Sequence, residues 1–195
     1  MHGFLRSFFL RALLAALVLA AASLWAQEVY HSRNTDLMAR LSYDSTAIVH
    51  GEDVRQVCIA VARDGDYRMV RMMNTGETER LEGKMTKDQV QQLKKLLATN
   101  EFRMLAGDHG GLIRQESESF GAEIPRGDEG GTQRLNWLNA DGERPFPDSV
   151  VKVVDWLKHF EAESGTPFEY AEYPDVCPAG GLRLLQPSMA QNGRP

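Results

Sequence analysis

Regular alternation of apolar and polar positions predicts strands in two parts of the chain. In the stretch 37–43, Leu, Ala, Leu and Tyr occupy every second position, which is typical of a half-buried strand. The stretches 116–124 and 132–139 predict two more strands. A polar tip, 125–131, joins them, so we expect them to pair as a hairpin.

A further hairpin is predicted in the stretch 54–73, where two apolar runs flank a turn. Asp64 and Gly65 fit a two-residue turn, because glycine adopts positive φ without strain. Pairing outward from this turn places Val61 opposite Arg68. Both faces of the hairpin are fairly apolar, so we expect it to lie inside a sheet that is at least partly covered on both sides.

Two stretches predict amphipathic helices. The first, 85–102, has Thr86 as a cap and Gln89 three residues later, which is the spacing of a capping box. The second, 147–164, is expected to be capped near Asp148. Each helix presents one apolar stripe, made in the first by Val90, Leu93, Leu96 and Leu97 and in the second by Val150, Val153, Val154 and Leu157.

The predicted order is β-β-β-α-β-β-α, which indicates an α+β fold. Hairpin connections favour antiparallel pairing, and helices with a single apolar stripe cover one face of a sheet. We therefore expect a two-layer sandwich, with an antiparallel five-stranded sheet and two helices on one face, over residues 37–163. Residues 164–195 are rich in proline and glycine and are expected to form a C-terminal tail.

The hairpin, the connection "NTGETERLEGK" and the helix "MTKDQVQQLKKLL" together resemble small exported bacterial domains of unknown function. The similarity covers roughly residues 37–160, and the motifs that carry it are structural. The resemblance implies a two-layer α+β domain in a bacterial envelope and implies no catalytic residues.

The first 26 residues have the parts of an export signal. Arg6 precedes an apolar run, and small residues lead to Ala26. The uncharged run 12–27 is 16 residues long, whereas a membrane-spanning helix needs roughly 20 apolar residues. We therefore expect cleavage near Ala26, a linker at 27–36, and a periplasmic or secreted location. The alternative is an uncleaved anchor, which would hold the chain at the membrane.

The charge of the chain excludes some partners. Removing the signal takes away two arginines and no acid, so the formal net charge changes from -5 to -7. Nucleic-acid binding needs clustered Lys and Arg to neutralise phosphates, and this chain has no basic run. We therefore expect no nucleic-acid partner, and contact with a membrane only if the N-terminal segment is retained.

Two cysteines, Cys58 and Cys177, would meet an oxidising environment after export. An even count permits a disulfide between them, and the segment 167–177 would then lie across the sheet face that the helices leave open. The alternative is that Cys58 is a small buried apolar residue and Cys177 a free thiol. The sequence leaves both interpretations open.

The loop 106–115 combines Asp108, His109 and Arg114 with two glycines, and it is the candidate site of the chain. Long loops are more often functional, although a plain solvated loop is the commoner case. The other histidines beyond the signal, His31, His50 and His159, are isolated. We therefore expect no metal site. No catalytic motif or cofactor motif is recognised, so no catalytic residue and no cofactor is predicted.

The leading interpretation is an exported, non-enzymatic binding or interaction domain, whose partner is an envelope protein or a small ligand. One alternative is an envelope hydrolase assembled around Asp108 and His109, with Ser117 or Ser119 as nucleophile. Another alternative is an inhibitor that inserts the hairpin tip 126–131 into a partner enzyme.

Overall fold

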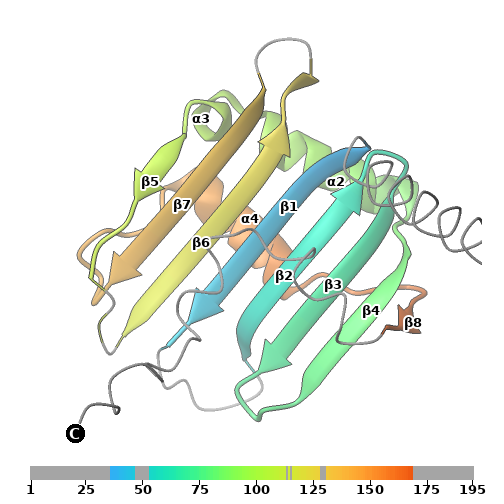
Figure 1. The fold of residues 1–195 in the computed structure, drawn as a ribbon, viewed down its shortest axis with the longest axis horizontal. Coiled ribbons are helices and arrows are strands. Elements are labelled where there is room, and N and C mark those ends of the chain that lie inside the picture. The colour runs from blue at the N-terminus through green and yellow to red at the C-terminus, as the bar shows by residue number, and fades with distance from the viewer. Residues whose placement is uncertain (1–35, 47–52, 113, 115, 128–130, 169–195) are drawn as a thin grey trace, which may run out of the picture. The chain divides into compact units, whose positions relative to one another are not determined.

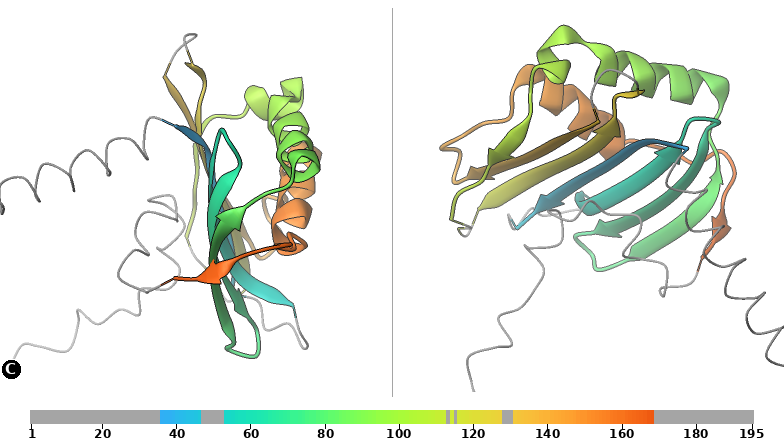
Figure 2. Two further views of the ribbon diagram at one scale, coloured as in Figure 1. Left: turned by 90° about the vertical axis from the view of Figure 1, so that its right-hand side faces the viewer. Right: turned by 45° about the horizontal axis from the view of Figure 1, so that its top comes forward.

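The computed structural model describes residues 36–46, 53–112, 114, 116–127 and 131–168. Within these ranges the chain forms one sheet, with its helices packed on one face (Figures 1 and 2). Leu37 opens the second of two compact units, and the first lies almost entirely outside the described residues. The α+β class is confirmed.

The described strands and helices have the following bounds. The strands are β1 (Leu37–Ser45), β2 (Val54–Ala62), β3 (Asp66–Met73), β4 (Thr78–Lys84), β5 (Gly107–His109), β6 (Ser117–Pro125), β7 (Thr132–Ala140) and β8 (Thr166–Pro167). The helices are α2 (Lys87–Ala98), α3 (Asn100–Arg103) and α4 (Asp148–Lys158). These strands make an eight-stranded sheet in the order β5-β7-β6-β1-β2-β3-β4-β8, in which β5 and β7 are parallel and the other pairs antiparallel.

The prediction of five antiparallel strands was wrong, because β4, β5 and β8 were not recognised. The prediction relied on the alternation of apolar and polar residues, and the sequence of β4, TERLEGK, has none. In the structure its residues are mostly half-buried, without alternation. Strands β5 and β8 have three and two residues, too few to show any period. Strand β5 follows α2 and α3, which carry the chain to the far edge of the sheet, and there it pairs parallel to β7 (Figure 1).

The register predicted for the hairpin of β2 and β3 was wrong by one residue. Val61 lies opposite Tyr67, not Arg68. The strands are joined by three residues, 63–65, with Gly65 at φ +95°, rather than by a two-residue turn. Since a shift of one residue exchanges the two faces of a strand, Tyr67 joins the core under the helices and Arg68 lies on the opposite face.

The helices begin and pack largely as the sequence predicts. Thr86 and Gln89 form both hydrogen bonds of the capping box. Helix α4 begins at Asp148, but its cap position is Pro147, which makes no side-chain capping bond. All the predicted stripe residues pack in the core under the helices, where Leu96 alone among them is only half-buried. No helix in the described part of the chain is both long and apolar enough to span a membrane.

After α4 the chain passes around the β4 edge of the sheet. The Tyr67 hydroxyl donates a hydrogen bond to the Ser164 carbonyl oxygen at 3.0 Å. The crossing is so close that a Cβ atom at Gly83 would collide with the same oxygen. Strand β8 then pairs with β4, and Phe168 packs on the face opposite the helices, which we call the second face. The sheet thus extends beyond the predicted boundary at residue 163.

Candidate functional site

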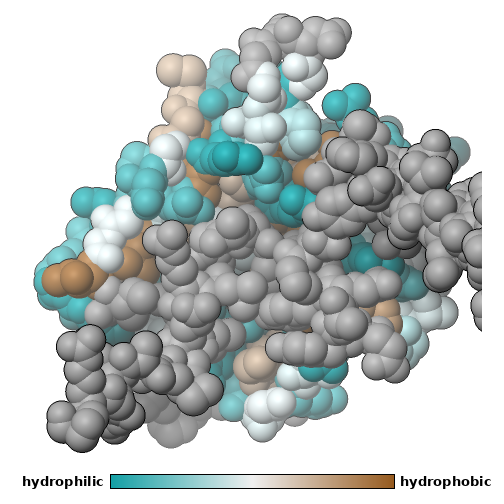
Figure 3. Space-filling view, in the orientation of Figure 1, coloured by the Kyte–Doolittle hydropathy of each residue, from teal (hydrophilic) through white to brown (hydrophobic). Residues whose placement is uncertain are grey.

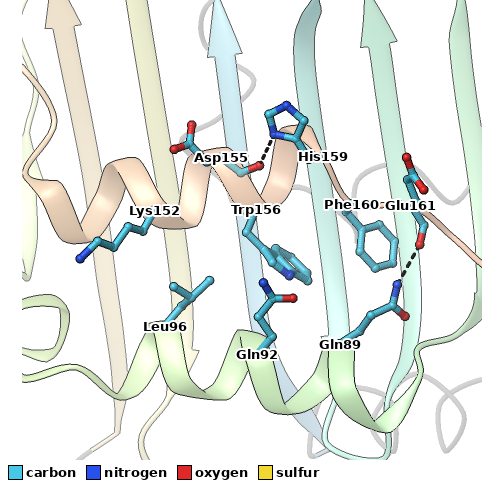
Figure 4. A pocket seen from close by; sticks show the side chains of 9 residues that line it. All are labelled: Gln89, Gln92, Leu96, Lys152, Asp155, Trp156, His159, Phe160 and Glu161. Atoms are coloured by element: carbon cyan, nitrogen blue, oxygen red, sulfur yellow. Dashed lines mark hydrogen bonds between the residues drawn. The ribbon is translucent and has the colours of Figure 1, made fainter.

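A groove lies between α2 and α4 on the helix layer (Figure 4). Its volume is about 490 Å³, within the range of ligand pockets, and it is open to solvent along one side. Leu96 from α2 and Trp156 and Phe160 from the α4 region supply its apolar part. The centroids of the Trp156 and Phe160 rings lie 5.3 Å apart, and both side chains are buried, so they form the apolar floor of the groove.

Polar side chains form the rim of the groove. They are Gln89, Gln92, Lys152, Asp155, His159 and Glu161. Some of these groups already serve the fold. The Gln89 amide nitrogen donates to the Glu161 carbonyl oxygen at 2.8 Å, and His159 Nδ1 lies 2.8 Å from the Asp155 carbonyl oxygen, to which it donates. The side chains of Gln92 and Lys152 are exposed at the rim and remain available to a partner.

A second polar feature lies on the second face of the sheet, in the row formed by Asp44 and Gln56. These residues are direct partners in the register of β1 and β2, and each is only 1% exposed. Within the described part of the chain, neither Asp44 carboxylate oxygen has a hydrogen-bond partner, and neither polar atom of the Gln56 amide has one. Buried polar groups in proteins are nearly always paired, so this row requires an explanation.

The surroundings of Asp44 change its protonation. Burial raises the pKa of the Asp44 carboxyl from 3.8 to about 7, because the charged form is poorly solvated there. The positive charge of Arg55 opposes this shift, but Arg55 is exposed and does not offset the burial. A carboxyl group that titrates near neutral pH is a common feature of functional sites.

The predicted site residues Asp108, His109 and Arg114 are not joined by any hydrogen bond or ion pair in the described part of the chain. Asp108 is exposed on β5. His109 follows it on the strand, and its ring stacks on Trp137 with centroids 4.4 Å apart. Consecutive strand residues point to opposite faces, so Asp108 is poorly placed to orient the His109 ring.

Arg114 belongs to a separate cluster near the end of β7. Its guanidinium lies 2.8 Å from a Glu143 carboxylate oxygen and 3.4 Å from one of Asp141. Its backbone N–H donates to the Ser117 hydroxyl, which in turn donates to the Arg114 carbonyl oxygen. These contacts fix the loop between β5 and β6, and they account for Arg114 without a ligand.

The serines considered as nucleophiles lie on the face away from His109. Trp137, on which His109 stacks, packs against the core under the helices. Phe120 is in that same core, so its neighbours at 117 and 119 on β6 point to the second face. Ser117 is fully buried with its hydroxyl engaged by Arg114. The sheet therefore separates the candidate base from the candidate nucleophiles.

The hairpin tip considered for the inhibitor lies partly outside the described residues, since 128–130 are not among them. Arg126, at its base, turns back toward the body of the domain. Its guanidinium donates to the Gln133 amide oxygen and to the Leu97 carbonyl oxygen at the end of α2. Burial lowers the pKa of Arg126. This side chain supports the end of α2 rather than extending toward a partner.

Cys58 is fully buried on the second face, where it packs with Val70, Ala60 and Phe168. The guanidinium of Arg68 lies 5.6 Å from the centre of the Phe168 ring. Phe168 belongs to the segment 167–177 that was expected to cross this face, and residues 169–177 lie outside the described residues. Cys177 lies outside the described residues, and the disulfide stays a prediction.

Sequence reasoning missed the Asp44–Gln56 row and the aromatic floor of the groove. Asp44 follows Arg40 and Ser42 on alternate positions, so it resembles a residue of a solvated strand face. Gln56 shares a face with Cys58, Ala60 and the other small residues of β2, and a polar residue in such a face was a usable signal. Trp156 lies off the predicted helix stripe, and only the packing of α4 on α2 brings it into the groove.

Among the residues that the structure describes, no group of three or more His, Cys, Asp or Glu side chains could hold a metal ion. Comparison with models of known protein families and with curated proteins finds no match for this chain.

Proposed function

We propose that this chain is an exported, non-enzymatic binding domain that docks a segment of an envelope protein in the groove between α2 and α4. The observation that carries the proposal is the groove itself, with an apolar floor, a polar rim and an open side between two helices. Apolar grooves of this kind accept an elongated segment that inserts an apolar side chain.

The rim indicates the chemistry of the partner. Lys152 lies toward one end of the groove and Glu161 toward the other (Figure 4). A segment with an acidic group near Lys152 and a basic group near Glu161 would complement both charges. An apolar side chain between them would contact Leu96 and the Trp156 ring, and such buried anchors usually supply most of the binding energy.

The hydrolase alternative is less well supported. A general base must come within hydrogen-bond reach of its nucleophile. His109 stacks on the helix side of the sheet, while Ser117 and Ser119 point to the second face. The inhibitor alternative is weakened in the same way, because the Arg126 side chain is held against α2 and Gln133. Both observations favour a binding domain without catalysis.

Docking in the groove predicts a position-specific effect of tryptophan. Gln92→Trp places a large side chain in the groove, so we expect at least a tenfold loss in the capture of a specific partner from envelope extract by the purified mature domain. Gln91→Trp is the matched control, because Gln91 is also exposed on α2 but is not among the residues that line the groove. It should capture the partner as the unchanged protein does.

Quantitative mass spectrometry of the captured proteins measures both variants. Equal capture by both variants would show that the partner binds elsewhere, and the absence of any protein enriched by the unchanged domain would remove the proposal. Circular dichroism of each variant checks that the fold is intact.

The export proposal predicts a defined mature species. We expect protein isolated from the envelope fraction to begin near Gln27 and to carry one disulfide between Cys58 and Cys177. Its intact mass should then be lower than that of the reduced chain by two hydrogen atoms. Retention of residues 1–26 would indicate an anchor, and alkylation of two cysteines without a reductant would exclude the bridge.

A further inference from the structure

We propose that Asp44 and Gln56, with the hydroxyls of Ser42 and Ser119 beside them, form a binding site for a small organic cation that carries N–H donors. The site lies on the second face of the sheet and is independent of the groove between α2 and α4. Figure 2 shows that the described helices all lie on the other side of the sheet.

The register of three strands places these side chains next to one another. Asp44 on β1 is the direct partner of Gln56 on β2 and of Ser119 on β6. Ser42 precedes Asp44 by two residues, so it points to the same face. Side chains of directly opposite residues in antiparallel strands begin about 4.5–5.5 Å apart at Cβ. The sheet thus places a carboxyl, a carboxamide and two hydroxyl-bearing residues close together on one face.

The polar atoms of the two central side chains, Asp44 and Gln56, have no partner among the residues that the structure describes. Both oxygens of Asp44 and both polar atoms of Gln56 are buried without a hydrogen bond. An unpaired buried polar group costs free energy unless something pairs with it. Two adjacent buried groups, each 1% exposed and without a partner among the described residues, favour a ligand that pairs with both.

The ion pairs on the second face indicate the charge of the ligand. Arg40 pairs with Glu123, and Arg68 with Glu82. Among the described residues Asp44 has no comparable ion pair, and Arg55 acts on it only at a distance. The group that would complete the row is therefore positive. Figure 3 shows both hydrophilic and apolar residues on the parts of this face that are not drawn in grey.

The donor set favours an organic cation over a metal ion. Calcium and magnesium prefer several carboxylate or carbonyl oxygens, and this row has a single carboxylate. An ammonium or guanidinium group donates several N–H bonds and can share them between a carboxylate and an amide oxygen. The Gln56 amide nitrogen can then donate to an acceptor elsewhere on the ligand.

The charge state of Asp44 makes binding depend on pH. The carboxyl must be ionised to accept bonds from a cation, so affinity should rise as the pH passes 7. Gln56 and the two serines beside the row, Ser42 and Ser119, do not titrate between pH 5 and 8. The charged groups near the row are Arg55, together with the Arg40–Glu123 ion pair on the same face.

The test uses methylguanidinium and butylammonium as probes, with tetramethylammonium as the control that has a charge but no N–H donor. Binding to the mature protein is followed at pH 8 by NMR. Asp44 and Gln56 are almost fully buried, so a probe is expected to enter slowly, and spectra are recorded until they no longer change. We expect saturable binding of at least one N–H cation, at least a tenfold weaker association for Asp44→Asn, and no saturable binding of tetramethylammonium.

Three outcomes would overturn the proposal. They are no saturable binding of either N–H cation, equal binding by Asp44→Asn, and equal binding of tetramethylammonium. Asp44→Asn is close in shape to the native residue, and circular dichroism shows whether it is folded. Gln92→Trp should bind the probes normally, so a failure of the groove proposal is distinguishable from a failure of this one.

Discussion

Replacing Leu93 by alanine is expected to lower the free energy of unfolding by about 2–5 kcal/mol, since a buried leucine leaves a cavity that its neighbours fill only in part. Leu93 lies in the middle of α2 and is fully buried between the helix and the sheet. The measurement is a denaturant titration of the mature protein.

The matched control is Leu96→Ala on the same helix. Leu96 is half-buried at the groove, so the same change removes less packing and should cost clearly less. A loss below about 0.5 kcal/mol for Leu93→Ala would mean that α2 does not pack on the sheet as described, because buried leucines do not behave in that way.

The second large effect concerns pH. The pKa of Asp44 is raised to about 7 in the folded protein, while the unfolded value is 3.8. Its contribution to stability is therefore fully present below pH 3.8 and is lost as the pH rises through 7. Between pH 5 and pH 8 we expect this group to lower the free energy of unfolding by roughly 2–3 kcal/mol, at about 1.4 kcal/mol per pKa unit.

Asp44→Asn provides the comparison, because an amide has no charge to lose. The difference in stability between the two proteins should change with pH in the window between 5 and 8, with the variant relatively more stable at pH 8. This difference cancels the effect of every titrating group that the two proteins share and that does not interact with residue 44. Parallel stability curves for the two proteins would contradict the assignment of the buried carboxyl.

The two proposed binding sites lie on opposite faces of the sheet. The groove between α2 and α4 lies on the helix layer, and the Asp44–Gln56 row lies on the other side of the sheet. A partner in the groove and a cation on the second face therefore do not compete for the same residues. The sheet strands β1 and β2 pack against α4, so both sites rest on one rigid core.

The local signals in the sequence predicted the helices better than the sheet. The capping box of Thr86 and Gln89 is formed by residues three apart, so its geometry depends little on the rest of the chain. The hairpin register depends on the length of its turn, and a three-residue connection is hard to distinguish from a two-residue one when Asp64 and Gly65 fit both. The short strands at the edges depend on pairing partners that lie far away in the sequence.

The candidate site in the loop 106–115 shows why residue types are a weak guide to chemistry. Asp108, His109 and Arg114 are near one another in the sequence, but strand alternation and the loop direct them to different partners. The row of Asp44, Gln56 and Ser119 is formed instead by three strands, and its members are up to 75 positions apart. No spacing rule in the chain links them.

By itself the sequence determined the α+β class, the apolar stripes of both long helices and the place of the strands around the first hairpin, because these follow from periodicity within a short window. Only the tertiary structure decided the eight-stranded mixed sheet, the face on which each residue of β3 lies and the burial of an unpaired carboxyl at Asp44. Those features depend on which strands, distant in the sequence, pair with one another, and on which side chains this pairing buries away from water.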